Sequence, residues 1–263
     1  MRLMVSIALL PLLAVTATAQ QRPAAPAVYR IHKLFLESTD LSRPLRQTIV
    51  QAFQGGTYNL DELAERVRFK LRDSGYALAE VKPAQVSRPR HAQHACDADV
   101  TFAIHTGNRY RLDGITFTVD PGQPVFTAAQ LRSQFHIEDG AVFNATEIGK
   151  GLENLKDLYG SDGYPNFGAI PKPIYDNSRH AIRLAVDIDQ GFPVTFGKLF
   201  MEGIEPRAGA AQQLLASWKE LEGKRFNSRL LREWLKNNSA EQVNNQNVAS
   251  VDPRVLNVLV HFR

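Results

Sequence analysis

Three stretches of the chain alternate apolar and polar residues over seven to nine positions, at residues 28–36, 110–117 and 195–201. Alternation at every second residue, with branched and aromatic side chains, is typical of a strand that is buried on one face. When Ile31, Leu112 and Phe196 are aligned, the stretches lie 81 and 84 residues apart. This spacing predicts an internal repeat of about 84 residues, and therefore three small domains in tandem.

A second marker repeats at the same interval. A glycine, an aromatic residue and an asparagine occur together in Gly56–Asn59, Gly140–Asn144 and Gly223–Asn227, and the asparagines lie 85 and 83 residues apart. A short helical stretch precedes each marker, and a longer segment with apolar residues three and four apart follows it, which predicts an amphipathic helix. The asparagine is expected to cap that helix, with Glu62 and Glu147 placed to complete capping boxes.

The end of the second helix is marked in two copies by Gly-Tyr, at Gly75-Tyr76 and Gly163-Tyr164. Two strands are expected after each of these ends, at residues 77–81 and 100–105 in copy one and at residues 166–170 and 182–188 in copy two. Copy three lacks Gly-Tyr and carries a polar run from Asn237 to Asn247 before an apolar strand at residues 255–262. The predicted unit is β-α-α-β-β, an α+β fold with two helices on one face of a three-stranded mixed sheet.

The N-terminus has the pattern of a secretory signal peptide. Arg2 is followed by an apolar run at residues 3–15 and by Ala17-Thr18-Ala19, a small-x-small cleavage pattern. We expect cleavage after Ala19, with an uncleaved anchor as the alternative, and no transmembrane segment afterwards. The expected organisation is a signal peptide at 1–19, a linker at 20–27, and domains at 28–107, 108–191 and 192–263, the last one degenerate.

The net charge and the motif content limit the classes of function that the sequence supports. A net charge of +4 over 263 residues is too weak to indicate nucleic-acid binding, although contact with an anionic membrane surface stays open. His91, His94 and Cys96 could be metal ligands, but they fall in a predicted loop where a solvated His-rich turn is the alternative. No nucleophile elbow, phosphate loop, dinucleotide fingerprint or His-Glu-x-x-His motif is present. We therefore expect no catalytic residues, no cofactor and no metal.

The pattern resembles the POTRA (polypeptide-transport-associated) domain family of outer-membrane assembly and translocation proteins. The residues that carry the resemblance are the opening strand Arg109–Phe117, the helix end Leu158–Tyr164 and the closing Val186–Gly191. Copy two matches best, and copy three departs after its second helix. Family members usually place such domains before a membrane β-barrel, for which this chain has no residues left. The chain is expected to be a stand-alone string of domains or one separated from its barrel.

The resemblance implies a periplasmic protein, associated with the outer membrane, that binds unfolded outer-membrane or exported polypeptides or a barrel partner. The strand after each Gly-Tyr would lie at a sheet edge, where a passing chain can pair with it. The candidate site residues are Ala77, Leu78, Ala79, Glu80 and Val81 in copy one, and Phe167, Gly168, Ala169 and Ile170 in copy two. The alternative is that neighbouring domains or proline-rich turns cover these edges, so that no chain can pair with them. A structural scaffold in a fixed cell-envelope complex, or a metal-dependent enzyme using His91 and His94, are the alternatives for the function.

Overall fold

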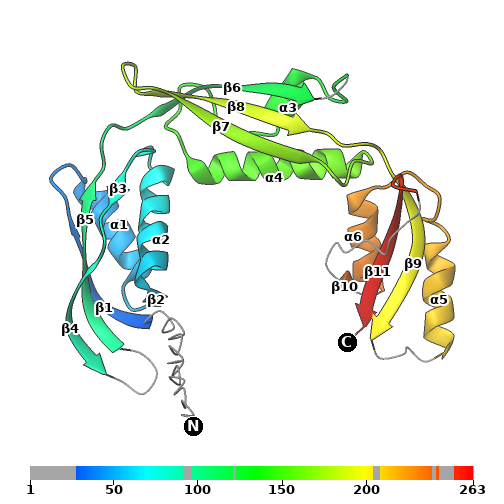
Figure 1. The fold of residues 1–263 in the computed structure, drawn as a ribbon, viewed down its shortest axis with the longest axis horizontal. Coiled ribbons are helices and arrows are strands. Elements are labelled where there is room, and N and C mark those ends of the chain that lie inside the picture. Colours follow the sequence, from blue (N-terminus) through cyan, green and yellow to red (C-terminus); the bar gives the residue numbers. More distant parts are fainter. Residues whose placement is uncertain are drawn as a thin grey trace, which may run out of the picture.

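The computed structural model describes residues 28–91, 96–120, 123–203, 208–238, 241–242 and 252–262. Three sheets follow one another along an arch, and the second helix of each repeat lies on its inner side (Figure 1). The expected signal peptide and linker, residues 1–27, lie outside the described residues. Among the helices that are described, none is long and apolar enough to cross a bilayer.

The second repeat has the predicted unit in its simplest form. It runs β6 (Arg111–Asp120), α3 (Ala128–Arg132), α4 (Ala145–Ser161), β7 (Gly168–Asp176) and β8 (Ala181–Asp189). The sheet order is β6-β8-β7, with β6 parallel and β7 antiparallel to β8. The inner face of the sheet packs with both helices around a core that includes Leu112, Leu155 and Ile182, all fully buried.

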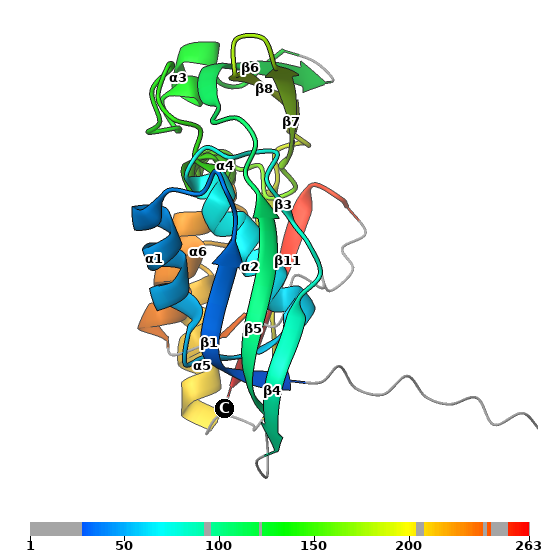
Figure 2. The same cartoon turned by 90° about the vertical axis from the view of Figure 1, so that its left-hand side faces the viewer.

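The first repeat has a larger sheet than predicted. It contains β1 (Val28–Glu37), α1 (Arg43–Phe53), β2 (Thr57–Asn59), α2 (Leu60–Asp73), β3 (Glu80–Val81), β4 (Gln85–His91) and β5 (Cys96–His105). Strand β4 departs from the expected loop after Val81. It pairs antiparallel with β5, which begins at Cys96 instead of Val100. Both β3 and β4 lie on the same side of β5, so they form one bent strand at the edge of the sheet (Figure 2).

The third repeat keeps the same order in a reduced form. It contains β9 (Thr195–Gly203), α5 (Ala208–Trp218), α6 (Ser228–Asn237), β10 (Glu241–Gln242) and β11 (Val255–Phe262). Strand β10 lies within the polar run at Asn237–Asn247, for which the sequence pattern indicated no element, and it pairs with the end of β11. Parallel pairing of β9 with β11 repeats the pairing of β6 with β8 and of β1 with β5. The α+β prediction of two helices on a mixed sheet is therefore confirmed in all three repeats.

The repeated glycine ties the first strand to the turn that follows the first helix. The amides of Gly55, Gly140 and Gly223 donate to the carbonyls of Ile31, Leu112 and Phe196, at 2.7, 2.6 and 2.8 Å. All three glycines have positive φ, between 79° and 85°. The equivalent glycine in the first repeat is thus Gly55, one residue earlier than the sequence alignment placed it. The alignment of Ile31, Leu112 and Phe196 is confirmed by these bonds.

The asparagine caps are confirmed, but the capping boxes are not formed. The side-chain oxygens of Asn59, Asn144 and Asn227 each accept a backbone N–H from the first turn of the next helix. Glu62 pairs with Arg66 instead, and Glu147 pairs with Lys150. Each glutamate forms an ion pair with a basic residue one turn further along its own helix, because residues three or four apart lie side by side on a helix surface.

The three sheets fall within the segments expected from the repeat. We propose the divisions after Gly107 and after Gly191 as the domain boundaries, since both glycines have a φ of +63° in the link between consecutive sheets.

Candidate functional site

The first predicted edge, residues 77–81, is only partly a strand. Ala77, Leu78 and Ala79 lie in a turn, and only Glu80 and Val81 pair with β5. Leu78 and Glu80 are exposed, whereas Ala79 and Val81 are buried in the core of the first repeat. Ala77 packs into the core of the second repeat, so it is not free to meet another chain. Only the last two residues of the expected edge strand are therefore paired with β5. The edge of the sheet continues from them along β4.

The backbone of Val81 has the orientation that an edge site needs. The amide of Lys82 donates to the carbonyl of Ala103 on β5 at 2.9 Å. Because inward and outward groups alternate along an antiparallel strand, the N–H and C=O of the preceding residue, Val81, face away from the sheet. An Nη of Arg68 lies 3.4 Å from the Val81 carbonyl oxygen. The outward-facing amide of Val81 is the donor that this edge offers to an incoming strand.

A groove of about 470 Å³ runs along this edge. Its lining comprises residues 77–83, Arg68 and Arg72 of α2, and Tyr175 of the second repeat. Leu78 is 47% exposed and Tyr175 is 40% exposed. Two large apolar side chains from different repeats thus flank the outward backbone of Val81, beside two arginines and Lys82.

The second predicted edge, residues 167–170, differs more from expectation. Phe167 precedes the strand, and its half-buried ring stacks on the buried Tyr159 at a centroid distance of 4.3 Å, so it packs against the core of the second repeat. Strand β7 then runs on from Gly168 to Asp176, through Pro171 and Pro173. It was predicted to end at Ile170.

Proline lacks an N–H, so it fits a ladder only where its nitrogen faces away from the partner strand. Positions 169, 171, 173 and 175 share that outward phase on β7. Two of its four outward donors are therefore missing at Pro171 and Pro173. Ile170 and Ile174, both more than half exposed, lie on the helix-free face of the sheet beside Lys172, which pairs with Asp187. The edge of β7 therefore offers an incoming strand only half of the backbone donors that its length would allow.

Two of the three histidine and cysteine candidates lie at paired strand ends. His91 is the last residue of β4 and pairs with Cys96, the first residue of β5. His94 lies outside the described residues. Within the described ranges, no group of three His, Cys, Asp or Glu side chains is placed to hold a metal ion.

The joint between the first and second repeats reuses the repeated motifs. The amide of Tyr110 donates to the carbonyl of Gly75 at 2.8 Å. The Nδ2 of Asn144 donates to the carbonyl of Asp73 at 3.0 Å, while its Oδ1 caps α4. The Asp73 carboxylate accepts both the amide and the hydroxyl of Thr146. One asparagine therefore caps its own helix and also holds the end of the helix before it.

The joint between the second and third repeats has the same plan with more charge. The amide of Val194 donates to Gly163 at 2.9 Å, and the Nδ2 of Asn227 donates to the Ser161 carbonyl at 2.7 Å. Two interdomain ion pairs are added, Arg225 with Asp162 at 3.1 Å and Arg232 with Asp157 at 3.0 Å, and all four side chains are about half exposed. The Gly-Tyr and Gly-aromatic-Asn motifs thus form the contacts between repeats as well as the folds within them.

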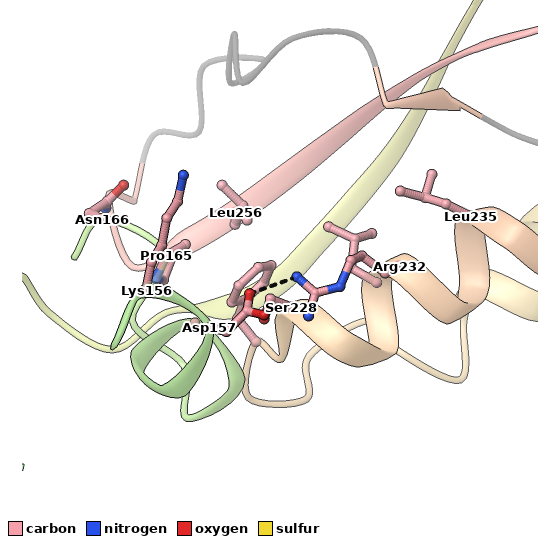
Figure 3. Close-up of a pocket in the computed structure, with 11 residues that line it drawn as sticks. Lys156, Asp157, Pro165, Asn166, Ser228, Arg232, Leu235 and Leu256 are labelled. Carbon is pink, nitrogen blue, oxygen red and sulfur yellow. Dashed lines mark hydrogen bonds and ion pairs between the residues drawn. The ribbon is translucent and has the colours of Figure 1, made fainter. Parts of the chain in front are cut away.

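A pocket of about 280 Å³ opens at this second joint, between α4 and α6 (Figure 3). Lys156, Asp157 and Gly160 of α4 form one wall, and the Arg232–Asp157 pair spans the two helices. The apolar part of the lining comes mainly from the third repeat: Phe226, Leu231, Leu235 and Leu256, with Pro165 from the second.

Sequence reasoning missed this pocket because it needs two repeats to be placed side by side. The available signal was Gly160, a glycine within the last turn of a helix whose end was already assigned to Gly163. A Cβ at Gly160 would lie 3.1 Å from the Oγ of Ser228. A larger residue at Gly160 would therefore press on the start of α6 at Ser228.

Known proteins with a similar sequence or structure have the same fold as the one described above. Residues 110–191 match the sequence model of the POTRA family, described as a surface antigen variable number repeat. The crystal structure of POTRA domains 3–5 of BamA from Haemophilus influenzae superposes with a TM-score of 0.69 at 16% identity, over 92% of this chain and 99% of that one. At that identity, the likeness shows the fold.

A curated relative matches a shorter part of the chain. It is a protein of Treponema pallidum described as an outer membrane protein assembly factor, 27% identical over 101 residues. The match covers 38% of this chain and 11% of that protein, so the chain spans about a tenth of the relative's length. Residues 110–191 therefore match the POTRA family model, and the described chain as a whole has the fold of a tandem of three POTRA domains.

Proposed function

We propose that this chain is a non-enzymatic, periplasmic protein-binding module that assists the assembly or translocation of outer-membrane proteins. Its partners would be unfolded outer-membrane or exported polypeptides, a barrel protein, or both. The support is the POTRA match of residues 110–191 and the similarity to an outer membrane protein assembly factor. A string of small domains with shallow surfaces suits binding better than it suits catalysis.

The proposed mode of binding is strand addition at the edge formed by β3 and β4. The observation that carries it is the outward backbone of Val81, set in a groove between Leu78 and Tyr175. An extended client would gain ladder hydrogen bonds there while its alternate side chains contact the two apolar walls. Such binding depends on backbone groups more than on sequence, as a component that handles many clients requires.

The test removes the outward N–H of Val81 and compares the result with a variant that keeps it. Val81→Pro deletes the N–H that faces away from the sheet, and Val81→Ala is its matched control, because it keeps that N–H while losing most of the side chain. Ala79 is unsuited to proline, since its amide donates to the Tyr76 carbonyl at 3.1 Å within the turn. A photocrosslinker in place of the exposed Leu78 reports client contact in cells.

We expect crosslinks to many outer-membrane precursors, reduced about fivefold in the proline variant relative to the alanine variant, as loss of one hydrogen bond implies. Melting temperatures of the two variants check that both remain folded. Equal crosslinking would contradict strand addition at this edge. A single stoichiometric partner in place of many precursors would favour the structural scaffold.

A further inference from the structure

The pocket between α4 and α6 is built by the joint and is separate from the strand edges. Leu231 and Phe226 in its lining are each 5% exposed, so its apolar wall is part of the core of the third repeat. The α4 wall is held at its place by the Ser161–Asn227 bond and by the Arg232–Asp157 pair. The volume, about 280 Å³, is large enough for one bulky apolar side chain.

The rim of the pocket carries an excess of positive charge. Arg232 is paired with Asp157, and both point across the gap between the helices (Figure 3). Lys156 is exposed and forms no ion pair with any described residue. An apolar wall with one unpaired cation at its mouth matches a ligand that has an apolar body and a neighbouring carboxylate.

We propose that this pocket binds a partner polypeptide through one large apolar side chain, phenylalanine or leucine, that is followed directly by an acidic residue. The apolar side chain contacts Leu231, Leu235 and Leu256, and the carboxylate pairs with Lys156. A single anchor with one rim ion pair binds weakly, so the site adds to a larger interface. Because the walls come from two repeats, an occupant also favours one angle between them.

The inference goes beyond the proposed function, since it concerns the helical side of the arch and needs no strand pairing. The probe is a synthetic capped hexapeptide, Gly-Ser-Phe-Glu-Ser-Gly, titrated into the isotope-labelled full mature chain. Backbone amide NMR shifts of Gly160, Ser228 and Leu231 report on the pocket. A peptide with Phe→Ser tests the apolar anchor, and one with Glu→Gln tests the carboxylate.

A double-mutant cycle then tests the pairing with Lys156. We expect the Glu→Gln peptide to bind the unmodified chain about threefold more weakly, as an exposed ion pair implies, and the Phe→Ser peptide to cause no shifts. Lys156→Gln should bind the Glu and Gln peptides equally. Lys236→Gln, an exposed lysine of α6 outside the pocket, is the matched control and should retain the threefold preference.

Several results would overturn the proposal. One is the absence of NMR shifts at the joint with the peptide at about millimolar concentration, where a weak site must begin to fill. A second is equal binding of the Phe and Ser peptides. A third is that Lys156→Gln still binds the Glu peptide more tightly than the Gln peptide. Shifts confined to Val81 and its neighbours would also overturn it, while leaving the strand-addition proposal standing. Circular dichroism of Lys156→Gln verifies that the variant is folded before the titration is interpreted.

Discussion

Tyr159 shows how one residue can be central to a core and still carry an unfavourable contact. Its ring is fully buried and lies within 4.3–6.0 Å of the rings of Phe126, Tyr164 and Phe167. Its hydroxyl has no hydrogen-bond partner among the described residues. Burial, and then the neighbouring Tyr164, raise the pKa of Tyr159 above its ordinary value of 10.0. The ring stabilises the second repeat, and the hydroxyl does not.

Tyr159→Phe should therefore stabilise the protein by up to about 1 kcal/mol, because an unsatisfied buried hydroxyl is removed. Tyr110→Phe is the control, since the Tyr110 hydroxyl donates to Asn177 at 2.7 Å and its loss should destabilise by about 1 kcal/mol. Urea unfolding measures both. Equal destabilisation by the two variants would show that the Tyr159 hydroxyl has a partner.

The same residue predicts a dependence on pH. The unfolded chain releases the Tyr159 proton near pH 10, whereas the folded chain holds it to higher pH, because its pKa is raised. The effect of this group on the free energy of unfolding is therefore independent of pH below pH 10, and that free energy falls as pH rises above 10. In Tyr159→Phe this part of the alkaline loss should disappear, which melting temperatures measured on either side of pH 10 would reveal.

Gly163 is a second residue whose role depends on its backbone. Its φ is +95°, and a Cβ there would lie 2.6 Å from the Nε of Arg225 in the next repeat. Gly163→Val should cost about 2–4 kcal/mol, through backbone strain and displacement of Arg225. Gly168→Val is the matched control, because Gly168 lies in β7 with no atom within 4 Å of its Cβ position. Similar melting temperatures for the two variants would contradict this account.

At the level of elements, local signals predicted the helices well. Asn59, Asn144 and Asn227 each mark a helix start, because a cap satisfies backbone groups that lie next to it in sequence. The edge strands were predicted less well, since a strand is stabilised by a partner far away in sequence. Strand β4 contains Pro89 and β7 contains two prolines, and both strands form because their edge position tolerates the missing donors.

In the candidate sites, too, features set by neighbouring residues in the sequence could be predicted, and features set by distant residues could not. The edge at Glu80–Val81 could be predicted from its place after Gly75-Tyr76, although the inward packing of Ala77 and Phe167 could not, because it depends on residues of other elements. The pocket between α4 and α6 could not be predicted at all, since no local pattern fixes how two repeats meet.

The dual role of the asparagines makes a prediction at the element level. Asn59→Ala should cost about 1 kcal/mol by loss of a cap. Asn144→Ala and Asn227→Ala should cost roughly 1 kcal/mol more, because each also loses a bond to the preceding helix. Hydrogen exchange of the helix that each asparagine caps measures these losses. Equal losses in all three variants would mean that the bonds between repeats contribute nothing.

The shape of the whole molecule depends on two joints with the same backbone plan and different charges. At the first joint, the Asp73 carboxylate binds the N-terminal turn of α4 through Thr146. At the second joint, Arg225 and Arg232 form exposed ion pairs with Asp162 and Asp157. The arch seen in Figure 1 therefore has one joint held by hydrogen bonds and packing, and another that relies partly on surface charge.

Salt should therefore loosen the second joint more than the first. The screening length falls from about 10 Å at 0.1 M salt to about 3 Å at 1 M, which weakens exposed ion pairs between repeats. Spin labels can be placed at exposed positions, Gln47 and Thr118 across the first joint and Thr118 and Lys219 across the second, after Cys96→Ser. The distance distribution across the second joint should broaden at high salt, while that across the first stays narrow. Arg225→Gln should reproduce the broadening at low salt, and equal broadening of both joints would show that these ion pairs do not set the angle.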